Sequence, residues 1–373
     1  MTESDALVGN PFPVRQWVPM RKSSMDLRVG TGILKELPRA LRTSVGRPHG
    51  CALLFDKTAA ADAVETLRRN LSERGFDLSV SELSELSCSL VGAQDLCELL
   101  ASLHVTGDDL VVVVGNYETL SVASFACAAW CDGVSLAQVP TSPLAAILAG
   151  PAPRALDLPG APYMIGQEGS ARFSAVDTEL FGCAPDDEPM LQARAAMVKA
   201  AMCDSEKAFG ELWDSADDLV SGSPSALVAR IQAAVKSCGK TVSASSAAVR
   251  QSVEYGRSFS RALLSVAAGA VPRSVAMADG MRFAARLAAA SQSLSVDDMF
   301  TQDDLLEKLG LGTTEVAIDE GQLLEAIRAE LFSRTRRLML ALPGALGRVR
   351  LAAVDEATLA EHVGAWCSTR PTA

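Results

Sequence analysis

The sequence predicts an α/β domain built on a parallel sheet, followed by a domain made almost entirely of helices. Three observations carry this prediction. Strand and helix patterns alternate in the first half, strand patterns fade after residue 185, and long helical patterns rich in Ala and Leu follow. The 373 residues leave room for two domains of about 150 residues each. We expect the domains at residues 1–185 and 186–373.

The first half opens with a proline-punctuated segment, residues 1–24, that predicts an irregular arm. Short apolar runs then predict strands, and the run LVVVV is typical of a parallel strand buried on both faces. The strands are expected at 27–29, 50–56, 78–80, 109–115 and 135–139, and the helices at 33–42, 59–74, 93–103 and 119–131. This alternation favours a Rossmann-like domain, in which a ligand is expected in a crevice at the carboxyl ends of the strands, between the two domains.

Helical periodicity dominates the second half. Residues 215–224 and 183–189 are polar and predict loops, and two short apolar runs at 338–342 and 348–351 predict a hairpin. The helices are expected at 191–203, 206–212, 225–238, 247–267, 273–294, 301–309, 320–334 and 356–366.

Composition excludes several function classes. The net charge of −11 argues against nucleic acid or an anionic membrane as the main partner. No apolar run reaches 18 residues, and the polar, acidic start is unlike a signal peptide, so a cytoplasmic location is expected. The nine cysteines are odd in number and scattered, which predicts small buried hydrophobic side chains in a reducing compartment rather than zinc ligands.

Residues 252–287 form a long stretch, rich in apolar and small residues, that predicts buried helix. It reads SVEYGRSFSRALLSVAAGAVPRSVAMADGMRFAARL. Arg257, Arg261 and Arg273 fall in or beside its most apolar part, and arginine is almost never fully buried unless it is paired. Helical spacing places Arg257 and Arg261 on one face.

Two interpretations of these three arginines stay open. They form a cationic pocket for a small anion, or they pair with acidic side chains. Arg282 and Arg286, one helical turn apart, are expected on a solvated face. The acids considered as partners are Glu254, Asp279 and Glu118.

Three motifs resemble the 3-dehydroquinate synthases, in order and spacing. Residues 133–143, GVSLAQVPTSP, resemble that family's strand and Pro-Thr-Thr turn. Residues 163–166, YMIG, with 176–180, VDTEL, resemble its Asn-Met-Ile-Gly stretch and Asp-Thr pair. Residues 276–287, AMADGMRFAARL, resemble the helix after its His-Gly-Glu. The resemblance spans most of the chain. It implies the dehydroquinate synthase-like fold, and a lyase of the shikimate pathway for aromatic amino acids that uses NAD and zinc or cobalt.

The family's metal ligands are one glutamate and two histidines, and none is found at the matching positions. The family's Ala-Glu-Val-Ile-Lys reads AAMVK here, so Ala196 replaces the glutamate. Its Gly-His-Thr-Phe-Gly-His reads GRSFSR and its His-Gly-Glu reads RSV, so Arg257 and Arg273 replace the histidines. Alanine donates nothing, and arginine has no acceptor and stays protonated. The sequence predicts that the metal has been lost.

The cofactor and substrate positions have changed as well. The family's glycine-rich nucleotide turn reads GNYETLS, where Gly115 alone remains, so NAD binding is also predicted to be lost. The substrate segment reads LAGPAPRA, which leaves Arg154 as a further anion-binding candidate. The positions that still match are Thr141, Thr178, Lys199 and Arg250, with Lys236 or Lys240 as a further lysine and Lys236 favoured by the gapless spacing.

The sequence therefore predicts a catalytically inactive homologue with a binding, regulatory or assembly role. Two alternatives remain: an active 3-dehydroquinate synthase or related sugar phosphate cyclase with a rebuilt site, and a module that binds a small anion through its arginines. Because the family is commonly dimeric, we expect a homodimer or a heterodimer with an active paralogue.

Overall fold

The computed structural model describes residues 13–44, 48–166 and 168–371, and the chain divides into two compact units. The N-terminal unit comprises Met1–Gly182 and Pro224–Ser243, and the C-terminal unit comprises Cys183–Ser223 and Ala244–Ala373. One helix from the second half of the sequence, α9 (Pro224–Ser243), thus belongs to the N-terminal unit, where it packs on β1 and β2.

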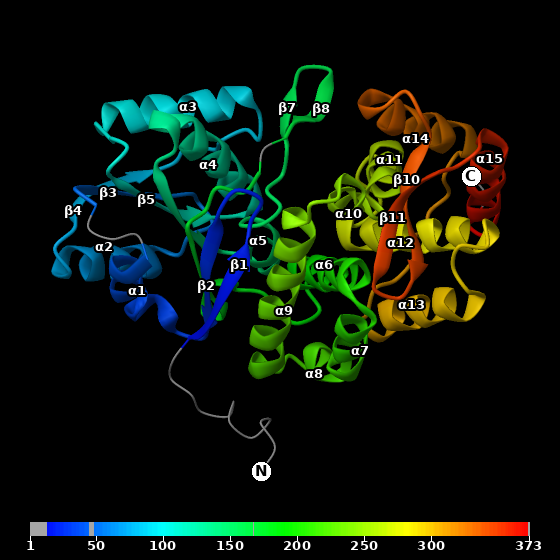
Figure 1. Ribbon diagram of the computed structural model, residues 1–373, viewed down its shortest axis with the longest axis horizontal. Coiled ribbons are helices and arrows are strands. Elements are labelled where there is room, and N and C mark those ends of the chain that lie inside the picture. The colour runs from blue at the N-terminus through cyan, green and yellow to red at the C-terminus, as the bar shows by residue number, and fades with distance from the viewer. Residues whose placement is uncertain (1–12, 45–47, 167, 372–373) are drawn as a thin grey trace, which may run out of the picture. The chain divides into compact units, whose positions relative to one another are not determined.

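A seven-stranded sheet in the order β1-β2-β9-β6-β5-β3-β4 forms the centre of the N-terminal unit (Figure 1). Only β1 and β2 pair antiparallel, and the five other pairings are parallel, which confirms the predicted α/β fold. The strands are β1 (Val14–Pro19), β2 (Ser24–Gly30), β3 (Gly50–Phe55), β4 (Asp77–Glu82), β5 (Leu110–Gly115), β6 (Ser135–Pro140) and β9 (Phe173–Asp177).

The expected irregular arm is wrong where the structure describes it, because residues 14–30 form a hairpin. Its stability has a visible cause: the fully buried carboxylate of Asp26 accepts from Arg15 at 2.9 Å and from Arg28 at 3.0 Å. A buried carboxylate needs such partners. Residues 1–12 lie outside the described part of the chain.

Helices cover both faces of the sheet. Leu110, Val112 and Val114 of β5 face a core that includes residues of α1 and α2, and alternation along a strand turns Val111 and Val113 to the other face, where α4 packs on β5 and β6. Besides α9, the helices are η2 (Ile33–Lys35), α1 (Leu37–Ser44), α2 (Ala61–Glu73), α3 (Leu90–Ser102), α4 (Tyr117–Ala129), η3 (Trp130–Asp132), α5 (Pro143–Leu148) and η4 (Thr178–Leu180). A small hairpin joins β7 (Leu156–Leu158) to β8 (Ala161–Ile165).

The C-terminal unit is built around one helix, α12 (Arg273–Ala290), which contacts α6, α11, α13, α15 and β10. Its other elements are α6 (Glu188–Asp204), α7 (Glu206–Asp214), α8 (Ala216–Val220), α10 (Ala247–Arg250), η5 (Gln251–Glu254), α11 (Arg257–Ala267), α13 (Val296–Lys308), α14 (Glu320–Arg334), β10 (Met339–Ala345), β11 (Arg348–Ala353) and α15 (Glu356–Ser368). The predicted hairpin near residue 340 is confirmed by the pairing of β10 with β11.

Three local predictions are wrong. Residues 215–224 contain the short helix α8 rather than only a loop. The helix expected at 247–267 breaks at Gly256, whose φ of 71° interrupts it between η5 and α11. Cys131 is exposed rather than buried. Within the described residues, every helix is too short or too polar to cross a bilayer.

Candidate functional site

The carboxyl edge of the sheet carries the three cofactor candidates Gly115, Thr141 and Thr178, at the ends of the parallel strands β5, β6 and β9. Thr141 donates its backbone N–H to the Gly115 carbonyl at 3.0 Å, and its hydroxyl lies 2.6 Å from that of Thr58. A Cβ on Gly115 would lie 2.6 Å from the Asp56 carboxylate, which accepts from the Asn116 backbone at 3.0 Å. Gly115 is therefore required by its own neighbour Asp56, whether or not a phosphate ever approaches it.

The turn after β5 is closed by its own side chains. Asn116 caps α4 by accepting from the Thr119 N–H at 2.9 Å, so this donor, which could otherwise face an anion, is satisfied within the chain. The hydroxyl of Tyr117 donates to the Ala152 carbonyl at 2.8 Å, and Glu118 places an acidic residue in the first turn.

Arg154, an anion-binding candidate, is engaged inside the N-terminal unit. One terminal nitrogen donates to the Cys88 and Ala155 carbonyls, at 3.2 and 2.9 Å, and the other donates to the Asp157 carboxylate at 2.8 Å. Its guanidinium also lies over the ring of Tyr163, 4.2 Å from the centroid. These contacts fasten the segment that leads into the β7–β8 hairpin.

Thr178 follows β9, at the same carboxyl edge of the sheet as Thr141. Its hydroxyl lies 2.9 Å from that of Thr31. The neighbouring carboxylate of Asp177 accepts from the backbone of Gly32 at 2.8 Å and Leu34 at 3.2 Å, so this corner holds the turn after β2.

The predicted metal position on α6 has no donor. Ala196 is 2% exposed and sits among the buried alanines and Met197 of that helix. Lys199, one turn further on, is half-buried. Arg194, which the sequence did not single out, is 1% exposed and donates to the carbonyls of Leu309 at 3.1 Å and Leu219 at 2.9 Å, a structural role.

Arg257 and Arg261 are held by carboxylates of the same unit. Arg257 pairs with Glu254 at 2.7 Å, and Arg261 pairs with Glu330 of α14 at 3.5 Å. Glu254 was one of the three acids considered from the sequence. We call the group formed by these side chains and the cations that act on them the Glu254 cluster: Lys199, Glu254, Arg257, Arg261, Glu330 and Arg334.

The charges of the Glu254 cluster shift the pKa values of its members. Burial alone would raise the pKa of Glu254, but Arg257, Lys199, Arg334 and Arg261 outweigh it and lower that pKa to about 2. Burial, and after it the charge of Arg257, lower the pKa of Arg261 to about 10, although Glu254 and Glu330 act in the opposite direction. With four cations and two carboxylates, the Glu254 cluster carries a net positive charge.

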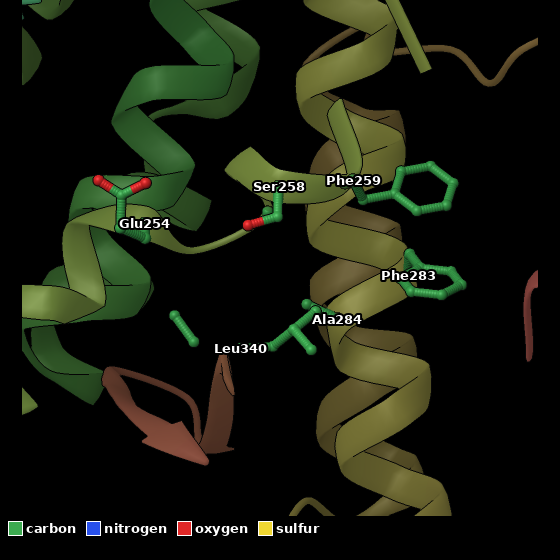
Figure 2. A pocket seen from close by; sticks show the side chains of 9 residues that line it. Glu254, Ser258, Phe259, Phe283, Ala284 and Leu340 are labelled. Atoms are coloured by element: carbon green, nitrogen blue, oxygen red, sulfur yellow. The ribbon is translucent and has the colours of Figure 1, made fainter. Parts of the chain in front are cut away.

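A small pocket lies beside the Glu254 cluster (Figure 2). Glu254, Ser258, Phe259, Phe283 and Leu340 line it, and its free volume of about 10 Å³ holds about one water molecule. It is narrow because α11 and α12 touch through glycines: a Cβ on Gly280 would lie 2.1 Å from the Gly256 carbonyl oxygen.

The remaining candidates are dispersed. Arg273 is the exposed first residue of α12 and is not among the charges that dominate at Glu254 and Arg261. Arg250 donates to the carbonyls of residues 244 and 245, each at 2.7 Å. Lys236 and Lys240 are exposed on α9, in the N-terminal unit.

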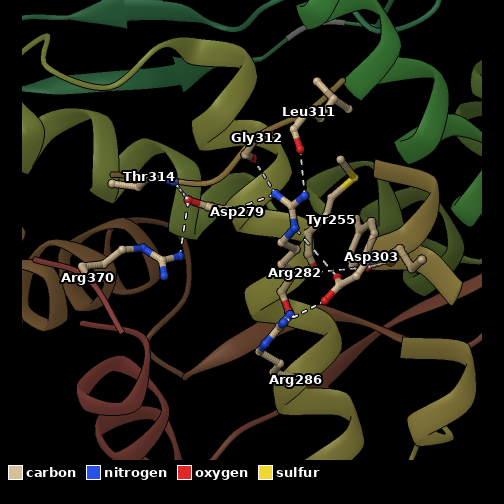
Figure 3. Close-up of polar contacts among 11 residues, drawn as sticks. Tyr255, Asp279, Arg282, Arg286, Asp303, Leu311, Gly312, Thr314 and Arg370 are labelled. Carbon is tan, nitrogen blue, oxygen red and sulfur yellow. Dashed lines mark hydrogen bonds and ion pairs between the residues drawn. The ribbon is translucent and has the colours of Figure 1, made fainter. Parts of the chain in front are cut away.

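A second group of charged side chains is centred on α12. Its member Arg282 is buried, contrary to the expectation that it faces solvent. Arg282 donates to the carbonyls of Gly312 at 2.7 Å and Leu311 at 2.8 Å, and Asp279 accepts from the Thr314 backbone at 2.8 Å (Figure 3). We call this group the Asp279 network: Asp279, Arg282, Arg286, Asp303 and Arg370.

The side chains of the Glu254 cluster do not fit a divalent metal. Among the described residues, no three His, Cys, Asp or Glu side chains come together in a way that could hold one. The guanidinium of Arg257 offers only N–H donors, and the cations around Glu254 would repel a further cation.

Comparison with known proteins identifies distant relatives of the chain. No family model matches it. It is 26% identical over 366 residues to the 3-dehydroquinate synthase of Xylella fastidiosa (strain M23), an alignment that covers 94% of this chain and 98% of that enzyme. The chain is a distant homologue of the 3-dehydroquinate synthases.

Solved structures support the same fold, that of the sugar phosphate cyclases. The chain superposes on 2-deoxy-scyllo-inosose synthase complexed with carbaglucose-6-phosphate, NAD+ and Co2+ with a TM-score of 0.81. The two sequences are 18% identical, and the superposition covers 94% of this chain and 99% of that enzyme. It also superposes on 2-epi-5-epi-valiolone synthase from Streptomyces hygroscopicus subsp. jinggangensis 5008 with NAD+ and Zn2+ bound, with a TM-score of 0.77, 16% identity and coverage of 93% and 97%.

Two members of the Glu254 cluster were missed from the sequence. Neither was a candidate from the sequence: Arg334 begins the short basic run RTRR, a pattern typical of a solvated helix end, and Glu330 stands at a family position that is also acidic. A signal was present, because Glu330 and Arg334 stand four residues apart on α14, the spacing of an ion pair on a helix face. Their approach to Arg261 depends on the packing of α11 against α14, which no local pattern reveals.

Proposed function

We propose that this chain is a catalytically inactive member of the sugar phosphate cyclase superfamily, with a binding, regulatory or assembly role. The observation that carries the proposal is the 2.7 Å ion pair between Arg257 and Glu254. Arg257 stands at a position where the resembling family has a metal-binding histidine. A protonated guanidinium held by a carboxylate supplies no lone pair to a metal.

Two further observations support loss of the metal. Ala196, at the glutamate position, is packed among apolar side chains and leaves no oxygen for coordination. Arg273, at the second histidine position, is exposed at the start of α12. A metal-dependent cyclase needs a metal cation that polarises a hydroxyl oxygen of the substrate. The residues at these three positions cannot hold such a cation.

The turn after β5 supports the proposal that NAD binding has been lost. The α4 amide of Thr119 is capped by Asn116, Tyr117 is bonded to the Ala152 carbonyl, and Glu118 adds negative charge where a pyrophosphate would need positive potential. Without a nicotinamide, the transient oxidation that begins the family's reaction has no hydride acceptor.

The second candidate is an active 3-dehydroquinate synthase or related sugar phosphate cyclase with a rebuilt site. The homology itself favours it, because the similarity extends over 94% of this chain and 98% of a relative named 3-dehydroquinate synthase. This candidate requires ligands other than those at the family's positions.

A turnover assay separates the two candidates. The full chain, supplied with NAD and with zinc or cobalt, is incubated with the family's heptulosonate phosphate substrate, and released phosphate is measured beside the Xylella enzyme as a positive control. The inactive homologue releases no phosphate above the blank. Release that depends on NAD and stops on chelation would establish the second candidate instead.

An assembly role predicts a stable oligomer. We propose a homodimer or a heterodimer with an active paralogue, in keeping with the dimers common in this family. Analytical ultracentrifugation of the chain alone, and mixed with such a paralogue, measures this directly. A monomer in both samples would remove the assembly role and leave the inactive-homologue proposal intact.

A further inference from the structure

Three helices of the C-terminal unit carry most of the net charge of the chain. Helices α7, α8 and α13 contain ten acidic residues and two lysines, a net charge of −8 out of −11 for the whole sequence. Eight of the ten acidic residues are exposed. Helix α8 contacts both α7 and α13, and Lys308 of α13 pairs with Asp217 of α8 at 3.2 Å. The three helices therefore form one strongly acidic surface (Figure 1).

The outer face of α13 adds two apolar side chains to this acidic surface. The inner face of the helix, which includes Leu305, is buried where α13 packs on α12 and α6. On the outer face, Val296 and Phe300 stand one helical turn apart and are 56% and 54% exposed. Large exposed apolar side chains that are grouped among polar ones are typical of an interaction surface. We call the exposed stripe the α13 face: Val296, Phe300, Asp304 and Glu307.

The same unit carries a segment of complementary character at the end of α14. Phe332 is 46% exposed, and three of the four residues at 334–337 are exposed arginines. Arg334 also acts on Glu254, so Arg336 and Arg337 are the cations on which the complementarity depends. Guanidinium groups beside an aromatic side chain match carboxylates beside apolar side chains in both charge and polarity. We call residues 332–337 the arginine segment.

We propose that the α13 face of one copy of this chain binds the arginine segment of a second copy. Helix α13 packs on α12 and α6, whereas α14 packs on α11 and α15, so the two surfaces lie at different edges of the C-terminal unit (Figure 1). A two-fold axis joins the α13 face of each copy to the arginine segment of the other, which closes the dimer. The inference rests on the assembly role proposed above, and it names the surfaces through which the copies meet.

Sedimentation equilibrium of the full chain over a series of concentrations gives the association constant that tests the proposal. Phe300→Ser removes the aromatic side chain from the α13 face and is expected to weaken association about tenfold. Arg337→Glu reverses a charge on the opposing surface and is also expected to weaken it about tenfold. Both residues are exposed, so each variant is expected to keep the fold, which circular dichroism checks.

An exchange of charges shows whether the two surfaces meet directly. Asp304→Arg alone is expected to weaken association about tenfold, because it places a positive charge opposite the arginine segment. The double variant Asp304→Arg and Arg337→Glu restores opposite charges across the contact, and it is expected to regain at least part of the lost affinity. A double variant that associates no more tightly than either single variant overturns the proposal.

Val80→Ser is the matched control, because Val80 is 40% exposed on β4 of the N-terminal unit, and this variant is expected to associate as the unmodified chain does. Equal weakening by the control overturns the proposal, as does an unmodified chain that is monomeric at every concentration. A dimer that Phe300→Ser and Arg337→Glu leave unchanged overturns the proposed contact and keeps the assembly role. Phosphate release in the turnover assay would instead overturn the inactive-homologue proposal, whatever the association constants are.

Discussion

Two groups of arginines in the C-terminal unit both pair with carboxylates, but they differ in how deeply the guanidinium groups are buried. In the Asp279 network, Arg282 donates to two backbone carbonyls and Arg286 donates to Asp303 at 2.7 Å, so the guanidinium groups fasten α12 to α13 and to the chain that follows it. In the Glu254 cluster, Arg257 pairs with Glu254 at 2.7 Å and Arg261 pairs with Glu330 at 3.5 Å, and Lys199 and Arg334 also act on Glu254.

The contribution of an arginine to stability depends on its burial and on the acceptors that its guanidinium binds. A buried guanidinium that donates to neutral backbone carbonyls, as Arg282 does, leaves those acceptors unsatisfied when it is removed. In the Glu254 cluster, the guanidinium groups pair with carboxylates that stay partly exposed, so solvent screens these pairs and each contributes less to stability. Arg282 should therefore contribute more to stability than Arg257, because its side chain is 5% exposed and that of Arg257 is 26% exposed.

The largest expected effect belongs to the Asp279 network. Arg282→Met should lower the free energy of unfolding by about 3–5 kcal/mol, since it leaves the Asp279 carboxylate and two carbonyls buried with fewer partners. Urea denaturation measures the change. A loss below about 1 kcal/mol would mean that Arg282 is dispensable and that the contrast between the two groups fails.

A smaller and pH-dependent effect is expected in the Glu254 cluster. The folded pKa of Glu254, about 2, lies below its ordinary value of 4.5, so its charge stabilises the fold above pH 4.5 and that contribution is lost as the pH falls toward 2. The difference in unfolding free energy between the unmodified chain and Glu254→Gln should shrink across that range. A difference independent of pH would show that the four cations do not act on this carboxylate.

The smallest effect concerns thiol reactivity and leaves both groups of arginines untouched. Burial raises the pKa of the Cys127 thiol to about 12, whereas Cys131, four residues on, is exposed. Cys131 should react first with a thiol reagent in the folded chain, and Cys127 only after denaturation. Rapid labelling of Cys127, read by peptide mass spectrometry, would contradict the burial of α4 on the sheet.

Much of the fold could be predicted from the sequence because its signals are local. The run LVVVV that became β5 is apolar throughout, as a strand covered on both faces must be, and the helix predicted at residues 320–334 was confirmed as α14. The hairpin of β1 and β2 was missed because prolines suggested an irregular arm and because the Asp26 ion pairs that stabilise it are not a local pattern.

The site was harder to predict because its contacts are remote in sequence. Arg282 was expected in solvent, yet its acceptors lie about thirty residues away in a segment without regular structure. The Arg257–Glu254 pair, three residues apart, was within reach of sequence reasoning, whereas the approach of Glu330 to Arg261 was not. The substitutions at the family's positions could be read from the sequence. The group of charges around Arg257 could not, because it forms only when α11, α6 and α14 pack together.

The content of bound metal tests the central claim most directly. After dialysis of the purified chain against zinc or cobalt and removal of excess ion, elemental analysis gives the number of metal ions per chain. If the Glu254 cluster has replaced the metal centre, the chain retains no stoichiometric zinc or cobalt. One ion per chain, lost on Glu254→Gln or Arg257→Ala, would contradict the account by placing a metal where these charges meet.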